Sequence, residues 1–214
     1  MKRALAYPYA SPTHSFLQIG DRTLELVPEG ADLSARAPLL AYGSNAAPEA
    51  LARKLAPLPE RPIPLIRAEL DDFDVVYSAH ISPHGAVPAT LRRSPGTSVA
   101  VFVAYPTEEQ RELLSGTEPN YELTRLRLRC RVETGEELAE LDAYLSRHGC
   151  LSIDGTEVAL TAVEAEGRRL GEMAQPQVLE YVRSRICPDL SLERFVLRSA
   201  EAGGLAPLPV FSAP

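Results

Sequence analysis

The stretch L-L-A-Y-G-S-N at residues 39–45 is the most informative part of this sequence. It begins as a short apolar run, typical of a buried strand, and then reaches a glycine, where a ligand can approach the backbone without meeting a Cβ. Residues 46–55 follow with helical spacing, since Leu51 and Leu55 share a face and Pro48 suits a first helical turn. The sequence therefore predicts a strand, a glycine turn and a helix in succession.

Two interpretations of this turn remain open. The backbone N–H groups of residues 43–45 and the start of the following helix can converge on one anion, because both present unpaired N–H donors. Alternatively, Ser44 or Asn45 simply caps the helix. The turn is not a phosphate-binding loop of the Gly-Lys-Ser/Thr type, and Ser44 lacks the flanking glycines of a nucleophile elbow.

Strands dominate the first two thirds of the chain, and helices dominate the last third. The expected strands are residues 23–27, 39–42, 73–79, 87–91, 99–105, 121–131 and 157–163, and the expected helices are residues 46–55, 107–114, 136–147, 175–186 and 191–200. Thr107 and Gln110 form a capping-box pattern, and Gly116 is suitably placed as a left-handed helix terminator. This order favours an α+β fold with a mixed or barrel-like sheet over a doubly wound sheet.

Glu118 is the second candidate functional residue, because it lies in a short E-P-N turn between a helix and the strand at residues 121–131. Rigid elements would hold its carboxylate on both sides, and a carboxylate that points into a pocket can act as a general base or acid. The alternative is an exposed surface turn. On the strand itself, alternating arginines mark the solvent side, and a change of parity predicts a bulge between Leu123 and Leu126.

The composition argues against several classes of protein. The chain has 214 residues and a formal net charge of -7, and no apolar run approaches the roughly 18 residues of a membrane span. The negative charge disfavours nucleic acid and anionic membranes as partners. The first residues lack the apolar core of a signal peptide, and the three cysteines have neither zinc-knuckle nor redox-dithiol spacing. We therefore expect a soluble cytoplasmic protein with reduced thiols.

Taken in order along the chain, these features resemble the γ-glutamylcyclotransferase-like superfamily, which also includes plant avirulence-induced-gene-like proteins. The resemblance rests on L-A-Y-G-S-N at 40–45 with its following helix, D-F-D-V-V-Y at 72–77, P-A-T-L at 88–91, and Glu118 shortly before Tyr121. It covers about residues 38–131. One departure from the family pattern is that residues 1–37 precede the glycine turn, which usually lies near the N-terminus.

The resemblance implies a small mixed β-barrel flanked by helices, with a cavity at the glycine turn. It divides the chain into four parts, namely an N-terminal extension at 1–37, a barrel core at 38–131, a mainly helical part packed on the core at 132–200, and a tail at 201–214. The additional C-terminal helical region has no counterpart in the resemblance. Its role and the oligomeric state stay open.

The resemblance also implies a lyase that works without cofactor or metal and converts a small γ-glutamyl amine or amide into 5-oxoproline and a free amine. The substrate's own α-amine attacks its γ-carbonyl, so the enzyme supplies positioning and one proton carrier. Glu118 would be the catalytic residue. The substrate-binding residues would be Tyr42, Gly43, Ser44, Asn45 and Tyr121.

Two other functions stay open from the sequence. A protein with the same fold and pocket could bind a small molecule in a regulatory role without turning it over, because fold does not determine function. A hydrolase that uses Ser44 as nucleophile is the other alternative, although the sequence places no His–Asp partners for it.

Overall fold

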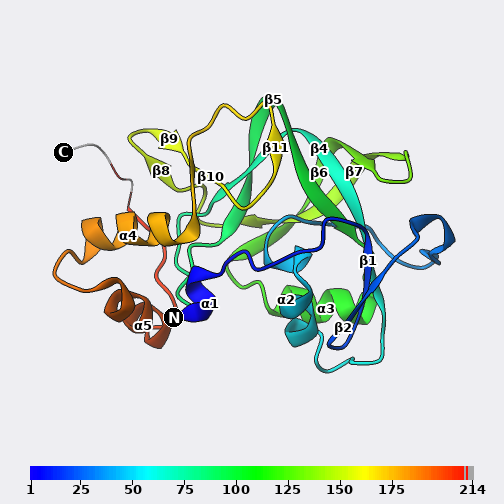
Figure 1. Ribbon diagram of the computed structural model, residues 1–214, viewed down its shortest axis with the longest axis horizontal. Coiled ribbons are helices and arrows are strands. Elements are labelled where there is room, and N and C mark those ends of the chain that lie inside the picture. Colours follow the sequence, from blue (N-terminus) through cyan, green and yellow to red (C-terminus); the bar gives the residue numbers. More distant parts are fainter. Residues whose placement is uncertain (210, 212–214) are drawn as a thin grey trace.

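The computed structural model describes residues 1–209 and 211, and among them five strands close into a barrel (Figure 1). The barrel strands are β3 (Leu39–Ala41), β4 (Ile63–Tyr77), β5 (Ala89–Ala104), β6 (Tyr121–Val132) and β7 (Glu137–Ser146). They pair in the ring order β3-β7-β6-β4-β5, with β5 returning to β3. Strands β3 and β7 are parallel and the other pairs are antiparallel. The predicted α+β fold with a small mixed barrel is confirmed.

Shorter strands extend this barrel at its edges. They are β1 (Phe16–Ile19), β2 (Arg22–Glu25), β10 (Ala159–Leu160), β11 (Ala165–Glu166) and β12 (Glu172–Met173), while β8 (Ser152–Ile153) and β9 (Thr156–Glu157) form a separate pair. Strand β1 joins β4, and β11 joins β5. Residues 1–37 therefore contribute strands to the main sheet.

The helices flank the barrel in two groups (Figure 1). They are α1 (Lys2–Leu5), α2 (Pro48–Lys54), α3 (Glu108–Gly116), α4 (Gln175–Ile186) and α5 (Leu192–Glu201), with 3-10 turns η1 (Pro28–Gly30) and η2 (Ser44–Ala46). Helices α1, α4 and α5 gather at one end of the molecule, and α2 and α3 lie beside the other end (Figure 1). In the described part of the chain, no helix combines the length and the apolar character needed to cross a membrane.

The start of α3 follows the sequence prediction, but its end does not. Thr107 Oγ1 accepts from the Gln110 N–H, and Gln110 Oε1 accepts from the Thr107 N–H, so the capping box is present. Gly116 is not a left-handed terminator, because the helix ends at Thr117 with a right-handed φ of -91°. The Thr117 hydroxyl donates to the Leu114 carbonyl and closes the last turn instead.

Strands β4 and β5 form one long hairpin where the sequence predicts shorter pieces. The expected strands at 87–91 and 99–105 belong to the single strand β5. The sequence pattern does not show that β5 is one strand, because Pro95-Gly96 interrupts the apolar run. The pairing of β4 with β5 also shifts register near Asp72, which has a φ of 60°. The Gly96 N–H donates to Asp72 Oδ1 at 2.8 Å, which joins the two irregular points across the hairpin.

The predicted helix at residues 136–147 is wrong, since this segment is strand β7. Leu138, Leu141 and Leu145 have helical spacing, but the backbone of the segment pairs with β6 along one edge and with β3 along the other. A strand inside a closed barrel satisfies its N–H and C=O groups on both sides, and this tertiary pairing outweighs local propensity. The barrel thus extends beyond the expected core of residues 38–131, and the following part is not mainly helical.

Strand β6 carries its arginines on the solvent side, as predicted. Arg125, Arg127, Arg129 and Arg131 pair there with acidic residues of β4 and β7. The irregularity in its pairing with β7 lies between Arg127 and Cys130, a few residues after the expected position between Leu123 and Leu126.

One ion pair lies inside the barrel wall. The Asp74 carboxylate in β4 is completely buried and accepts from Arg168 Nε and Nη2, both at 2.9 Å, and from the Val75 N–H at 2.8 Å. Arg168 also donates to Glu172 and to the Val163 carbonyl. This closed pair ties the loop before β12 to the barrel.

Candidate active site

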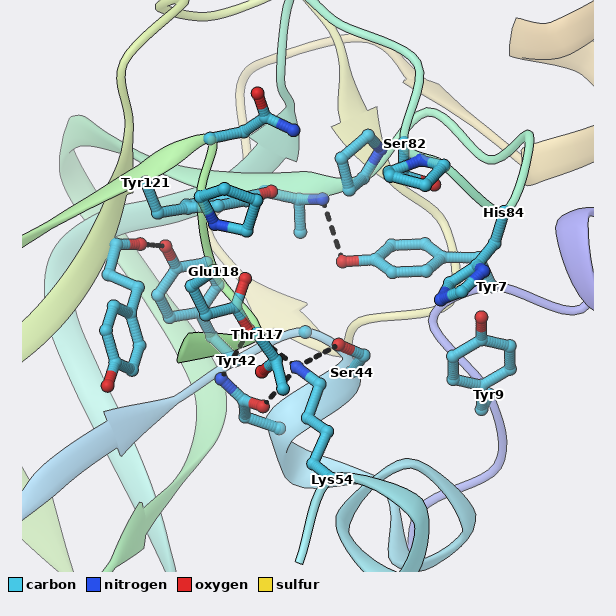
Figure 2. A pocket seen from close by; sticks show the side chains of 18 of the residues that line it. Tyr7, Tyr9, Tyr42, Ser44, Lys54, Ser82, His84, Thr117, Glu118 and Tyr121 are labelled. Carbon is cyan, nitrogen blue, oxygen red and sulfur yellow. Dashed lines mark hydrogen bonds and ion pairs between the residues drawn. The ribbon is translucent and has the colours of Figure 1, made fainter. Parts of the chain in front are cut away.

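A cavity of about 340 Å³ lies beside the glycine turn (Figure 2). Its walls come from the N-terminal segment at Tyr7 and Tyr9, the turn at 42–45, the end of α2, the loop at 80–89 and residues 116–121, together with Leu40 and Tyr144. A volume of this size is suited to a small molecule. All six residues that the sequence singled out as site residues line this one cavity.

Glu118 lines the cavity directly beside the glycine turn, in hydrogen-bond contact with Asn45 (Figure 2). Its Oε1 accepts from Lys54 Nζ at 2.5 Å and from Asn45 Nδ2 at 3.1 Å. Lys54 Nζ also donates to Asn45 Oδ1 at 2.7 Å, so the three side chains form a closed triangle. Among the described residues no hydrogen bond is made to Glu118 Oε2. One carboxylate oxygen is therefore anchored, and the other is free to exchange a proton with a ligand.

Local backbone contacts hold Glu118 in this position. Its N–H donates to the Ser115 carbonyl at the end of α3, and its carbonyl accepts from the Tyr121 N–H at the start of β6. The residue thus lies in a tight turn between a helix and a strand, as the sequence predicted. The side chain of Glu118 is only 12% exposed, so the alternative of an open surface turn is wrong.

The side chains of the turn point into the cavity and do not cap α2. The 3-10 turn η2 moves the cap position to Ala47, and no side chain caps there, which corrects the expectation for Ser44 and Asn45. Ser44 Oγ instead lies 3.4 Å from Lys54 Nζ. Because both polar side chains of the turn contact Lys54, the turn, α2 and Glu118 form one charged wall of the cavity.

Several tyrosines also line the cavity. The Tyr42 hydroxyl donates to the Tyr144 carbonyl, and the Tyr121 hydroxyl donates to the Ala89 carbonyl at 2.8 Å. Burial raises the pKa of both hydroxyls well above the usual value, so both stay protonated. Since these two O–H groups are used by backbone carbonyls, Tyr42 and Tyr121 offer a ligand their rings, not their protons.

Residues at the mouth of the cavity are positively charged. Burial lowers the pKa of Arg53, and the nearby charge of Arg3 lowers it further. Burial also lowers the pKa of His84, followed by the charges of Arg3, Arg53 and Lys54. Like charges lower each other's pKa values in this way only when they lie close together, so Arg3, Arg53 and Lys54 form a cluster of positive charge.

Sequence reasoning missed Tyr7, Lys54 and Arg53. The position of Lys54 on the helix directly after the glycine turn was a usable signal, because that helix must pack beside the turn. Nothing in the sequence pointed to Tyr7, which belongs to the segment that was expected to be an extension.

The pocket histidine His80 is held neutral. Burial lowers its pKa to about 4, with a further contribution from the charge of His148, and its Nδ1 lies 2.7 Å from Ser78 Oγ. No histidine hydrogen-bonds Ser44 within residues 1–209 and 211. The only basic neighbour recorded for Ser44 there is Lys54, which is ion-paired with Glu118. The Ser44 hydrolase alternative therefore lacks a general base.

Comparisons with known proteins bear on the fold. No protein-family model and no curated protein matches the chain. The chain is similar to a solved gamma-glutamyl cyclotransferase. That match has 19% sequence identity and a TM-score of 0.42, and it covers 52% of this chain and 66% of the cyclotransferase, just under two thirds of its length.

Two further solved structures are similar to the chain. One is an Arabidopsis thaliana protein, with 21% identity and a TM-score of 0.42 over 55% of this chain and 73% of that one. The other is an uncharacterised Homo sapiens protein, with 17% identity and a TM-score of 0.35. That match covers 76% of this chain and 87% of the human protein. At such identities a shared chain path does not define a substrate, so activity depends on the residues that line the pocket.

Proposed function

We propose that the protein is a γ-glutamylcyclotransferase-like lyase that releases 5-oxoproline and a free amine from a small γ-glutamyl amine or amide. The observation that carries this proposal is the Glu118 carboxylate, which lines the cavity beside the glycine turn, is anchored at Oε1 and has no hydrogen bond at Oε2 within the described residues. A ring closure within the substrate needs no enzyme nucleophile. It needs one proton carrier and a site that bends the substrate.

The reaction balances with Glu118 as the proton carrier. Oε2 takes a proton from the α-ammonium of the substrate, and the neutral amine attacks the γ-carbonyl carbon. A C–N bond forms, and the carbonyl oxygen becomes an oxyanion. Glu118 returns its proton to the outgoing nitrogen, and the bond between this nitrogen and the former γ-carbonyl carbon breaks. The ring nitrogen still carries a second proton, which Glu118 takes up and passes to the released amine, so the products are 5-oxoproline and an ammonium group and Glu118 is again a carboxylate. Lys54 and Asn45 keep the carboxylate aimed throughout, because both hold the oxygen that does not take part.

The charge of the cavity supports an anionic glutamyl group as the ligand. Lys54 and Arg53 line the cavity, and Arg3 lies close enough to lower the pKa of Arg53. The α-carboxylate of a γ-glutamyl compound suits this surface. The apolar rings of the tyrosines that line the cavity would cover the methylene groups of the same substrate.

The test is release of 5-oxoproline, detected by mass, from a panel of γ-glutamyl amino acids and amines, with and without a chelator. Glu118→Gln keeps the shape and removes the proton carrier, so it should lower the rate about 10²–10⁴-fold without changing the melting temperature much. Ser44→Ala is the matched control, and it should keep most of the activity.

Two outcomes would favour the alternatives. Binding of 5-oxoproline without turnover of any panel member would support a regulatory binding protein with the same fold. A hydrolytic product that depends on Ser44 and not on Glu118 would support the serine hydrolase.

A further inference from the structure

Tyr7 places its hydroxyl group beside the glycine turn, inside the cavity (Figure 2). The hydroxyl lies 2.7 Å from the position that a Cβ on Gly43 would occupy, so the space above the glycine is already partly filled by this group. The Ala89 N–H donates to it at 2.8 Å.

The proton of this hydroxyl has no acceptor in the part of the chain that the structure describes. There the Tyr7 oxygen accepts a hydrogen bond and donates none. Tyr42 and Tyr121 differ in this respect, since each donates its proton to a backbone carbonyl. Tyr7 is thus a tyrosine of this cavity that a backbone N–H holds in place and whose own proton remains available to a ligand.

The surroundings keep this proton on Tyr7. Burial raises the pKa of its hydroxyl far above the usual value, and the nearby negative charge of Glu118 raises it further, while the N–H groups of Ala89 and Ser44 act in the opposite direction. A buried neutral donor fixed by a backbone N–H is a suitable partner for an oxygen that gains negative charge during a reaction.

We propose that Tyr7 is a catalytic residue that donates a hydrogen bond to the γ-carbonyl oxygen of the substrate as it becomes an oxyanion. This inference rests on the proposed lyase function and adds a residue to it. Glu118 moves the proton between the two nitrogens, and Tyr7 keeps its own proton while it stabilises the oxygen between them. The N-terminal segment then forms part of the reaction site.

Two other roles for Tyr7 make different predictions. If the hydroxyl only binds the α-carboxylate of the substrate, its removal raises KM and leaves kcat unchanged. If the ring only packs in the core, the loss of the hydroxyl affects stability and leaves both constants unchanged. An oxyanion donor acts mainly in the transition state, so its removal lowers kcat.

The experiment compares wild-type protein with Tyr7→Phe on whichever γ-glutamyl compound of the panel turns over, measuring kcat, KM and the affinity for 5-oxoproline. Tyr181→Phe is the control, because it removes a buried hydroxyl that has no partner in the described residues and lies outside this cavity. We expect kcat to fall about 10²–10³-fold for Tyr7→Phe, with KM and 5-oxoproline binding changed less than about threefold. Tyr181→Phe should retain the wild-type constants.

A second variant covers the case in which Tyr7→Phe does not fold. Gly43→Ala keeps the tyrosine but places a methyl group against its hydroxyl, so kcat should again fall while 5-oxoproline still binds. An unchanged or higher kcat in a folded Tyr7→Phe protein, or a change in KM alone, overturns the inference and leaves the lyase intact. Absence of turnover by the wild-type protein overturns both.

Discussion

Two buried acid–base pairs, Asp74–Arg168 and Glu118–Lys54, differ in how completely the protein surrounds them. Asp74 is 0% exposed, and both of its oxygens accept from the forked guanidinium. Glu118 is 12% exposed, and only its Oε1 is bonded, to the single ammonium of Lys54 and to Asn45. The first pair leaves no oxygen for a ligand, whereas the second leaves one.

This difference separates a structural carboxylate from a candidate catalytic one. Arginine fits a carboxylate with two parallel hydrogen bonds, which suits a permanent link between segments. Lysine offers a point charge, which can hold one oxygen and leave the other to react. Burial alone does not distinguish a structural carboxylate from a candidate catalytic one. The number of carboxylate oxygens that have no hydrogen bond does distinguish them.

The largest expected effect comes from breaking the closed pair. Arg168→Met leaves the Asp74 carboxylate buried without its partner, so the free energy of unfolding should fall by about 3–5 kcal/mol. Urea unfolding measures the change. The double variant Asp74→Leu with Arg168→Met should recover most of the loss, and a single variant as stable as wild type would show that the pair is not structural.

A smaller effect concerns His80, a buried titratable group of the pocket with no charged partner. Its folded-state pKa of about 4 lies below the ordinary histidine value of 6.5, so the unfolded chain takes up a proton first as the pH falls. Stability should be full above about pH 6.5 and decline toward pH 4, with about 2 kcal/mol lost from this group by pH 5.

The measurement is the pH dependence of urea unfolding for wild-type protein and His80→Gln. The variant should lose less stability between pH 7 and pH 5 than wild type, because it lacks the group that titrates. Parallel pH curves for the two proteins would contradict the assignment. His148 and Tyr121 pack against the His80 ring, so a change at His148 contributes to the same curve.

The smallest effect on stability should come from breaking the Glu118–Lys54 pair, which leaves one carboxylate oxygen without a hydrogen bond within the described residues. Lys54→Met leaves Glu118 held by Asn45 at the edge of a cavity that water can enter, so the free energy of unfolding should fall by at most about 1–2 kcal/mol. The released carboxylate is no longer aimed, and kcat/KM for 5-oxoproline release should fall about 10–10²-fold. A fully active Lys54→Met would show that the pair does not orient the proton carrier.

The sequence predicted well those elements whose signal is local. The capping box at Thr107 starts α3, and the amphipathic spacing of residues 175–186 matches α4. The glycine turn and the Glu118 turn line one cavity and touch through the hydrogen bond between Asn45 and Glu118. In each case the residues that make the signal are neighbours in the chain, so local geometry already contains the answer.

Only the tertiary structure decided the closure of the barrel and the composition of its pocket. Leu138, Leu141 and Leu145 suit a helix, yet β7 forms because β6 and β3 supply partners to both of its edges. Tyr7 enters the site because the N-terminal segment crosses the molecule and packs against Gly43 and Ala89. Both outcomes depend on contacts between residues far apart in sequence. Such contacts leave no periodic pattern or fixed spacing in a single sequence, so they cannot be predicted from it.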